Sequence, residues 1–451
     1  MNDSCIRSTA ASLVDAMEAL WALPDSARQE LTTTRVYSKL LDDLTLHCSA
    51  VRKCGAGIAI FGALAGLGLP CNLPASKKHL SISAGEAAAR LKSAIEATSF
   101  TRFHLLPLDL ADDFPTIHFG SATIGPLTTD QLRYLVDHDR LERIHSGTSF
   151  DLHQFSQFQW LVVQEEVPIA RGADGRELFR FHFDPLEDFG RIEPHRGKYP
   201  EIVDTALFWL ALAPWEQWAQ GRHADWRGLQ IPWAYTVDHD LFSIMKRPPS
   251  SDTLTWAEQT ASEGGHPVEV LRPVKMWLPD DAGEGLTNYF KAKLGAIAHL
   301  PKLQLLQTPV AHFLTRAFLT SGIDEFMAHL LAIEAALGLP NDYKRKSSSG
   351  AKTHESFSGA DRVAARLAAL LDVGAASEYQ LLYKLRSQFL HGRMMQAIST
   401  AERLTARSVA RRAVDALVTK NHANQTLERN GYLDDLLAQG ALVIAGQGQG
   451  D

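Results

Sequence analysis

The sequence predicts an α+β multidomain protein, with a mixed α/β N-terminal region followed by an all-α helical bundle. Strand-like and helix-like segments mix between about residues 100 and 300, whereas the apolar residues after residue 303 follow a helical period. A chain of 451 residues has room for about two or three domains. We divide it into a mainly helical region (1–98), a mixed α+β domain (99–302), a helical domain (303–420) and a partly disordered C-terminal extension (421–451).

The N-terminal region is predicted to be helical at residues 8–22 and again at 85–97. Between these helices, residues 55–70 are apolar and rich in glycine. The fifteen residues before Pro70 are fewer than the roughly 20 that a membrane-spanning helix needs. We therefore expect a buried strand or a glycine-kinked core segment here, and no membrane partner. The glycine spacing matches neither a phosphate-binding loop nor a dinucleotide fingerprint.

Four cysteines, Cys5, Cys48, Cys54 and Cys71, lie near the N-terminus without the paired spacing of a zinc ribbon. His47 beside Cys48 leaves a metal site open as an alternative, but free thiols in a reducing cytoplasm are the simpler explanation. No signal peptide is recognised at the start of the chain. The expectation is a cytoplasmic protein with no metal and no cofactor.

The middle domain is predicted to contain a strand at Ile117–Ile124 and then a helix that runs through Val136. Thr128 and Gln131 have the spacing of a capping box, in which each side chain bonds the other residue's backbone N–H at the helix start. A hairpin is expected next, with strands Gln159–Ile169 and Glu177–Phe183. Its second strand is favoured because Phe179, Phe181 and Phe183 alternate with other residues.

A helix is expected over Glu201–Gln220, interrupted at Pro214, with a further short strand near Leu229–Val237. Trp209, Trp215 and Trp218 crowd into this helix. Buried tryptophans usually belong to a core. The alternative is a platform that stacks bases or anchors a protein ligand.

The first helix of the predicted bundle, Ile323–Leu337, carries an apolar stripe that includes Phe326 and Leu330. Glu334 falls on or beside this stripe. A carboxylate at such a position is destabilising unless a cation meets it, so Arg366 or Arg386 is the expected partner.

Asn341–Ala360, which contains the basic cluster Lys344–Lys346, is expected to be a mobile loop, and two more helices are predicted in the sequence that follows this loop. Asp361–Leu371 is predicted to be helical and to end at Gly374. The next helix should bury Leu382, Leu385 and Phe389. From Gln439 onward the tail is expected to be disordered.

Arg386 and His391 lie near the end of that helix, five residues apart, in a segment that stops at Gly392. Arginine presents a charged planar fork that suits phosphate oxygens, and histidine exchanges a proton near neutral pH. The pair therefore suits phosphodiester cleavage without a metal. Five residues turn an ideal helix through about 500°, which leaves the two side chains roughly 140° apart, so one chain does not direct both at one point.

The last helix, Ala401–Val418, is predicted to place Arg403, Arg407 and Arg411 along one face. Such a stripe suits an RNA backbone, the alternative being a solvated face. Residues 303–420 contain 15 Lys and Arg against 10 Asp and Glu, a net charge of +5, whereas the whole chain carries −7. A basic module on an acidic chain favours a nucleic-acid-facing domain.

Residues of about 310 to 420 resemble the HEPN superfamily, and within it the ApeA-like branch of prokaryotic defence proteins. The resemblance rests on the glutamate-bearing helix with Glu334, the Arg-x-Ala-type helix Asp361–Leu371 and the Arg386–His391 segment. It implies a homodimer in which the motif helices of two chains meet at a two-fold axis and line one cleft for RNA.

The same resemblance implies attack of an RNA 2′-hydroxyl on the adjacent phosphate. His391 would act as general base or acid, and Arg386 would stabilise charge on the phosphoryl oxygens. Glu334, Tyr383 and Ser387 would be supporting residues. Ser387 departs from the family, in which asparagine, aspartate or histidine often follows the arginine.

The implied function is a metal-independent endoribonuclease of antiphage defence by abortive infection, which cuts host RNA such as tRNA when the N-terminal region senses a phage-derived trigger. Ser387 keeps open a non-catalytic HEPN module that binds RNA, a nucleotide or a partner protein. A scaffold in a larger complex is a third, weaker alternative.

Overall fold

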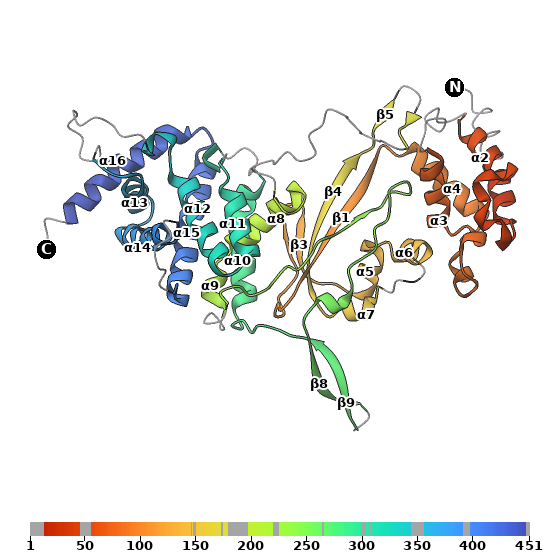
Figure 1. Ribbon diagram of the computed structural model, residues 1–451, viewed down its shortest axis with the longest axis horizontal. Coiled ribbons are helices and arrows are strands. Elements are labelled where there is room, and N and C mark those ends of the chain that lie inside the picture. Colours follow the sequence, from red (N-terminus) through yellow and green to blue (C-terminus); the bar gives the residue numbers. More distant parts are fainter. Residues whose placement is uncertain are drawn as a thin grey trace. The chain divides into compact units, whose positions relative to one another are not determined.

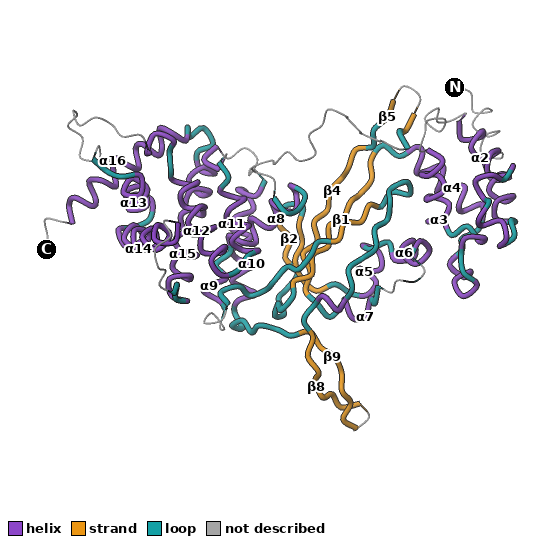
Figure 2. Tube along the Cα trace, viewed as in Figure 1, coloured by secondary structure: helices purple, strands orange, loops and turns teal. Residues whose placement is uncertain are grey.

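The computed structural model, shown in Figures 1 and 2, describes twelve stretches of the chain. They are residues 13–45, 56–145, 147, 150–172, 175–178, 197–219, 225–263, 266–298, 304–306, 308–343, 356–390 and 397–447. Contacts divide the chain into two units. The first comprises residues 1–107, 126–191 and 232–254, and the second comprises 108–125, 192–231 and 255–451.

The first unit begins with a helical cluster. Residues 13–21 are helical, followed by α2 (Arg35–Thr45), α3 (Ala56–Leu67) and α4 (Ala84–Glu96). Short 3₁₀ turns connect them at Asp25–Gln29, Leu31–Thr33, Pro70–Asn72 and Ala75–Leu80. The glycine-rich run is thus a helix, and its Ile60 and Leu64 are fully buried against Leu20, Leu40 and Leu91. The predicted helix at 85–97 is confirmed.

Three short helices complete the helical part of this unit: α5 (Thr129–Leu135), α6 (His138–Ile144) and α7 (Leu152–Phe155). The predicted capping box is confirmed, because the Thr128 hydroxyl accepts a hydrogen bond from the Gln131 N–H and the Gln131 side chain accepts one from the Thr128 N–H. Asp137, between α5 and α6, has a left-handed backbone (φ +46°). This residue turns the chain sharply enough for α6 to follow α5 directly.

The main sheet has five strands in the order β2-β3-β4-β1-β7. Its strands are β1 (Ser99–Leu108), β2 (Ile117–Phe119), β3 (Ala122–Pro126), β4 (Gln159–Pro168) and β7 (Tyr235–Asp238). β1 pairs antiparallel with β7, with Phe103 opposite Val237. The predicted single strand Ile117–Ile124 is wrong. Its two ends pair with each other in a β2–β3 hairpin that turns at Gly120, where φ is +59°.

The predicted second hairpin falls only partly on described residues. Its first strand corresponds to β4, and β5 (Arg171–Gly172) pairs with β6 (Gly175–Arg176) across residues 173 and 174. Phe179, Phe181 and Phe183 lie outside the described residues.

In the second unit, α8 (Glu201–Leu212) and α9 (Trp215–Trp218) are separated at Pro214, which confirms the predicted interruption. Trp209 and Trp215 are fully buried, as the core interpretation predicted. β8 (Trp256–Glu263) and β9 (His266–Pro273) form a separate two-stranded ribbon in which Trp256 is opposite Pro273. A 3₁₀ turn at Ser251–Thr253 precedes it.

The remainder of the second unit is helical, and its helices between residues 303 and 420 agree with the predicted helical bundle. It contains α10 (Ala282–Ile297), α11 (Val310–Leu319), α12 (Gly322–Leu337), α13 (Gly359–Leu370), α14 (Val373–Leu390), α15 (Thr400–Ala423) and α16 (Arg429–Gln447), with 3₁₀ turns at Gln304–Leu306 and Pro340–Tyr343. Figure 1 shows these helices gathered in one bundle, in which α11 packs on α12, α12 on α15, and α13 on both α14 and α16.

Three local predictions in this bundle are wrong. Gly374 does not end α13, since that helix stops at Leu370 and Gly374 lies in the first turn of α14. Phe389 is 40% exposed instead of buried. The tail is helical as far as Gln447, where α16 ends. This helix packs against α13, and Gly440 allows the close approach, because a Cβ at residue 440 would meet the carbonyl oxygen of Ala365.

Candidate functional site

Arg386 and Glu334 form an ion pair between α14 and α12. Arg386 Nη2 lies 3.3 Å from Glu334 Oε2, and the two side chains are only 18% and 13% exposed. The expectation that a cation would meet Glu334 is therefore confirmed for Arg386. The other candidate, Arg366, is fully buried and bonds Asp342 at 2.5 Å.

Two tyrosines of α14 complete the surroundings of this ion pair. Tyr379 hydrogen-bonds Glu334, and the Arg386 guanidinium lies 5.5 Å from the centre of the Tyr383 ring. Burial raises the pKa of Glu334, although Arg386 and the Tyr379 hydrogen bond act in the opposite direction. The guanidinium is thus held by a carboxylate on one side and an aromatic ring on another, which fixes its position.

The end of α14 presents apolar surface close to this pair. The description of α14 runs to Leu390, and His391, the predicted proton-transfer residue, lies outside the described residues. Ser387 is half-buried. Leu381, Phe389 and Leu390 are 62%, 40% and 53% exposed, so the helix leaves apolar side chains unburied along its length.

The predicted exposed basic stripe on α15 is wrong for Arg407 and Arg411. Both are buried, and Glu216 of α9 accepts hydrogen bonds from Arg407 Nε at 3.3 Å and from Arg411 Nε at 2.6 Å. Arg407 also donates to the carbonyl oxygens of Ala211 and Ala213. These guanidiniums are used to join α15 to α8 and α9, so they are not free to follow an RNA backbone.

The electrostatics of this buried cluster follow from its close pairing. Burial by itself raises the pKa of Glu216, but the charges of Arg407 and Arg411 more than offset it, and the pKa lies below its usual value. Burial lowers the pKa of Arg407 to about 10, which leaves the guanidinium charged at neutral pH.

Glu325, one helical turn from the N-terminus of α12, is the centre of a second buried cluster. Its carboxylate accepts hydrogen bonds from Trp226 Nε1 at 2.7 Å, Arg227 Nη2 at 3.1 Å and Arg403 Nη2 at 2.7 Å. Arg403, the third residue of the predicted stripe, is thereby occupied as well. Three donors satisfy a carboxylate that has no exposed surface.

His329, one turn further along α12, is fully buried beside this cluster, 5.6 Å from the Trp226 ring. Neither ring nitrogen has a hydrogen-bond partner in the part of the chain that the structure describes. Burial, together with the charges of Arg407, Arg227 and Arg403, lowers the pKa of His329 well below its ordinary value. The ring is therefore neutral at physiological pH.

Sequence reasoning missed Glu216, Glu325 and His329. The acidic residues are ordinary helix-start residues by position, and nothing in their local pattern marks them as buried. The one available signal was the arginine spacing on 401–418, since arginines that recur on a helix require carboxylate partners when that face is covered.

The described residues contain neither a cluster suited to a metal ion nor a helix suited to span a membrane. Among the described residues, no three His, Cys, Asp or Glu side chains are grouped so as to hold a metal ion. Cys71 is buried as a free thiol, whereas Cys5, Cys48 and Cys54 lie outside the described residues. No described helix combines the length and apolarity needed to cross a membrane. The chain matches no protein-family model, no curated protein and no solved structure.

Proposed function

We propose that the protein is a metal-independent endoribonuclease of HEPN type, with Arg386 and His391 as its catalytic residues. The observation that carries the proposal is the ion pair between Arg386 and the half-buried Glu334, which fixes the guanidinium within the last two turns of α14, directly before His391 in the sequence. A fixed arginine and a residue that exchanges protons near neutral pH, five positions apart in the sequence, are two groups suited to phosphodiester cleavage.

In the proposed reaction the RNA 2′-hydroxyl oxygen attacks the adjacent phosphorus while the bond to the 5′-oxygen of the next nucleotide breaks. His391 from one chain takes the hydroxyl proton, and His391 from the other protonates the leaving oxygen. Arg386 stabilises the charge that develops on the phosphoryl oxygens. The products are a 2′,3′-cyclic phosphate and a 5′-hydroxyl end.

A homodimer through α14 is part of the proposal. The exposed Leu381, Phe389 and Leu390 support it, because a helix that leaves large apolar side chains unburied is suited to contact with a second copy. Dimerisation would also resolve the angle of roughly 140° between the two catalytic side chains of one helix. The proposed setting is cytoplasmic antiphage defence, with host RNA such as tRNA as substrate and a phage-derived trigger.

The test is incubation of the purified protein with total cellular RNA in EDTA, analysed on a denaturing gel. Wild type and the matched control Lys384→Ala, an exposed cation on the same helix, should cut RNA. His391→Ala and Arg386→Ala should leave it intact while still forming dimers.

Two results would contradict the proposal. Equal cleavage by all four proteins would assign the activity to a contaminant. If all four leave RNA intact and all four protect cells equally against phage, chemistry at these residues is not required. That result would favour the non-catalytic HEPN module, the alternative that the half-buried Ser387 after Arg386 keeps open.

A further inference from the structure

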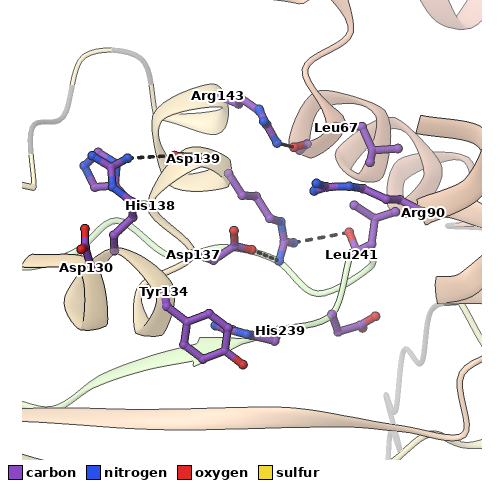
Figure 3. Close-up of a pocket in the computed structure, with 14 residues that line it drawn as sticks. Leu67, Arg90, Asp130, Tyr134, Asp137, His138, Asp139, Arg143, His239 and Leu241 are labelled. Atoms are coloured by element: carbon purple, nitrogen blue, oxygen red, sulfur yellow. Dashed lines mark hydrogen bonds and ion pairs between the residues drawn. The ribbon is translucent and has the colours of Figure 1, made fainter. Parts of the chain in front are cut away.

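The first unit contains a cavity of about 470 Å³ that the proposed nuclease does not use. Helices α3, α4, α5 and α6 and the segment after β7 contribute its walls. Figure 3 shows Arg90 and Arg143 reaching into it from one side and the Tyr134 and His239 rings at another. Its volume falls within the range of small-molecule sites in proteins.

The guanidiniums of the half-buried Arg143 and the buried Arg140 give one part of this cavity a positive character. Arg143 donates from Nε to the carbonyl oxygen of Leu80 at 2.9 Å and from Nη1 to that of Gly66 at 3.1 Å. Within the described part of the chain, no carboxylate lies within the 4.0 Å of an ion pair with Arg143. Neutral carbonyl groups therefore position the Arg143 guanidinium but do not neutralise its charge.

Arg140 reinforces this positive character. Its side chain is 6% exposed and donates to the carbonyl oxygens of Asp238 and Leu241 at 3.2 and 3.4 Å, and also to that of Ser243. Its Nε, beside Gly66 in the cavity wall, has no hydrogen-bond partner among the described residues. Burial lowers the pKa of both Arg140 and Arg143, although nearby carboxylates, Asp137 for Arg140 and Asp139 for Arg143, act in the opposite direction. A bound anion would favour the charged forms further.

The carboxylates around the cavity are largely paired with arginines. Asp139 pairs at 3.1 Å with Arg133, which also lines the cavity, and Asp240 pairs with the buried Arg176 at 2.6 Å. Asp137 lies 3.8 Å from Arg140. Among the described residues, Arg90 pairs only with an exposed carboxylate, that of Glu86 on the same helix, at 2.7 Å. Such exposed pairs contribute little, so a ligand anion can replace Glu86.

The opposite side of the cavity suits an aromatic group attached to that anion. Tyr134 is 63% exposed, and its ring is 5.0 Å from His239 and 6.0 Å from Phe103, both in edge contacts. The His239 and Phe103 rings thus support the Tyr134 ring, which remains open to stacking by a further ring. Asp130, four residues earlier on α5, lies on the same helix face, where its carboxylate can accept hydrogen bonds from ribose hydroxyls.

From this arrangement we infer that the cavity binds a nucleotide. Arg143 and Arg90 hold its phosphate, Asp130 its ribose hydroxyls, and Tyr134 stacks on its base. This site is independent of the proposed ribonuclease centre, because all the residues that line it belong to the first unit.

The test is isothermal titration of the full-length protein with the four nucleoside 5′-monophosphates, ribose 5-phosphate and inorganic phosphate. At least one nucleotide should bind more tightly than ribose 5-phosphate and phosphate. Arg143→Gln and Arg90→Gln should each weaken its binding about tenfold to a hundredfold, the effect of losing one charge-assisted contact. Arg35→Gln, an exposed arginine of α2 outside the cavity, should bind as wild type does.

A second variant separates stacking from charge. Tyr134→Ala should weaken nucleotide binding but leave ribose 5-phosphate binding unchanged, since only the base contacts this ring. Because Arg143 joins two backbone segments and its loss can disturb folding, Arg90→Gln, on an exposed helix face, provides the decisive arginine measurement. Absence of binding by all four nucleotides, equal affinity for phosphate and nucleotide, or unchanged affinity in Arg90→Gln would each overturn the assignment.

Discussion

Arg407 and Glu216 are 191 residues apart in the sequence, yet Arg407 Nε lies 3.3 Å from Glu216 Oε2 with both side chains buried. Arg411 bonds the other oxygen of the same carboxylate. This cluster joins α8 and α9 to the helices that follow β9, although the strands β7, β8 and β9 separate them in the chain. The predicted division placed α8 and α9 in the mixed α+β domain that ends at residue 302, so the helical unit depends on a segment from outside the predicted helical domain.

Glu216→Gln should strongly destabilise the protein. The substitution leaves two buried guanidiniums without their anion, and breaking a buried ion pair in this way typically lowers the free energy of unfolding by about 3–5 kcal/mol. Urea denaturation measures the change. The control Arg412→Gln removes a pair with Asp372 on the exposed side of the same helix and should lower it by at most about 1 kcal/mol. Similar losses for both variants would contradict a special role for Glu216.

The sequence was sufficient for the helices of the second unit but not for the partners of their charged residues. Periodicity located α12, α13 and α15, and the cost of burying Glu334 led to Arg366 or Arg386 as the partner, of which the structure shows Arg386. The arginine spacing on residues 401–418 predicted an exposed face. Periodicity identifies a polar stripe but does not show what covers it. Glu216 and Trp226, which cover that stripe, come from a distant segment. Long-range pairing of this kind leaves no local signal.

His329 should make the protein less stable in mild acid. Its pKa in the folded state lies well below 6.5, its value in an unfolded chain, so the unfolded state binds more protons as the pH falls through 6.5. This one group should lower the free energy of unfolding by up to about 1.4 kcal/mol per pH unit below that point. His329→Leu, which replaces a buried ring that lacks hydrogen bonds, should lose this dependence and be at least as stable at pH 7.

Urea denaturation at pH 7.5, 6.5 and 5.5 tests the role of His329. The informative quantity is the difference between wild type and His329→Leu at each pH, since other groups titrate in both proteins. His266→Gln, at an exposed position of the β8–β9 ribbon, is the matched control and should follow wild type. A constant difference across the three pH values would show that His329 is not held neutral.

Asp204 of α8 should have the opposite pH dependence. Burial raises the pKa of Asp204 to about 6 from its ordinary 3.8, so between these values the folded protein holds a proton that the unfolded chain has released. The free energy of unfolding should therefore fall as the pH rises through this window. Since the carboxyl is only half-buried and solvent screens it, we expect an effect of about 1 kcal/mol.

The Asp204→Asn variant isolates this contribution. It should be more stable than wild type at pH 7 and equal to it below pH ~4, where the aspartate is protonated in both states. Urea denaturation at pH 4 and pH 7 provides the comparison. A variant less stable than wild type at pH 7 would mean that the ionised carboxylate is stabilised by its surroundings.

Glu334 should act as a positioning residue in the proposed nuclease. Its carboxylate holds Arg386 at 3.3 Å, so Glu334→Gln should slow RNA cleavage about tenfold, the loss of roughly one ion pair. The affinity for RNA, measured by fluorescence anisotropy in a His391→Ala background that does not cut, should stay within a factor of about two. A structural role alone would lower the stability and leave the cleavage rate of the folded protein unchanged. Cleavage at the wild-type rate by a folded Glu334→Gln dimer would therefore remove Glu334 from the mechanism.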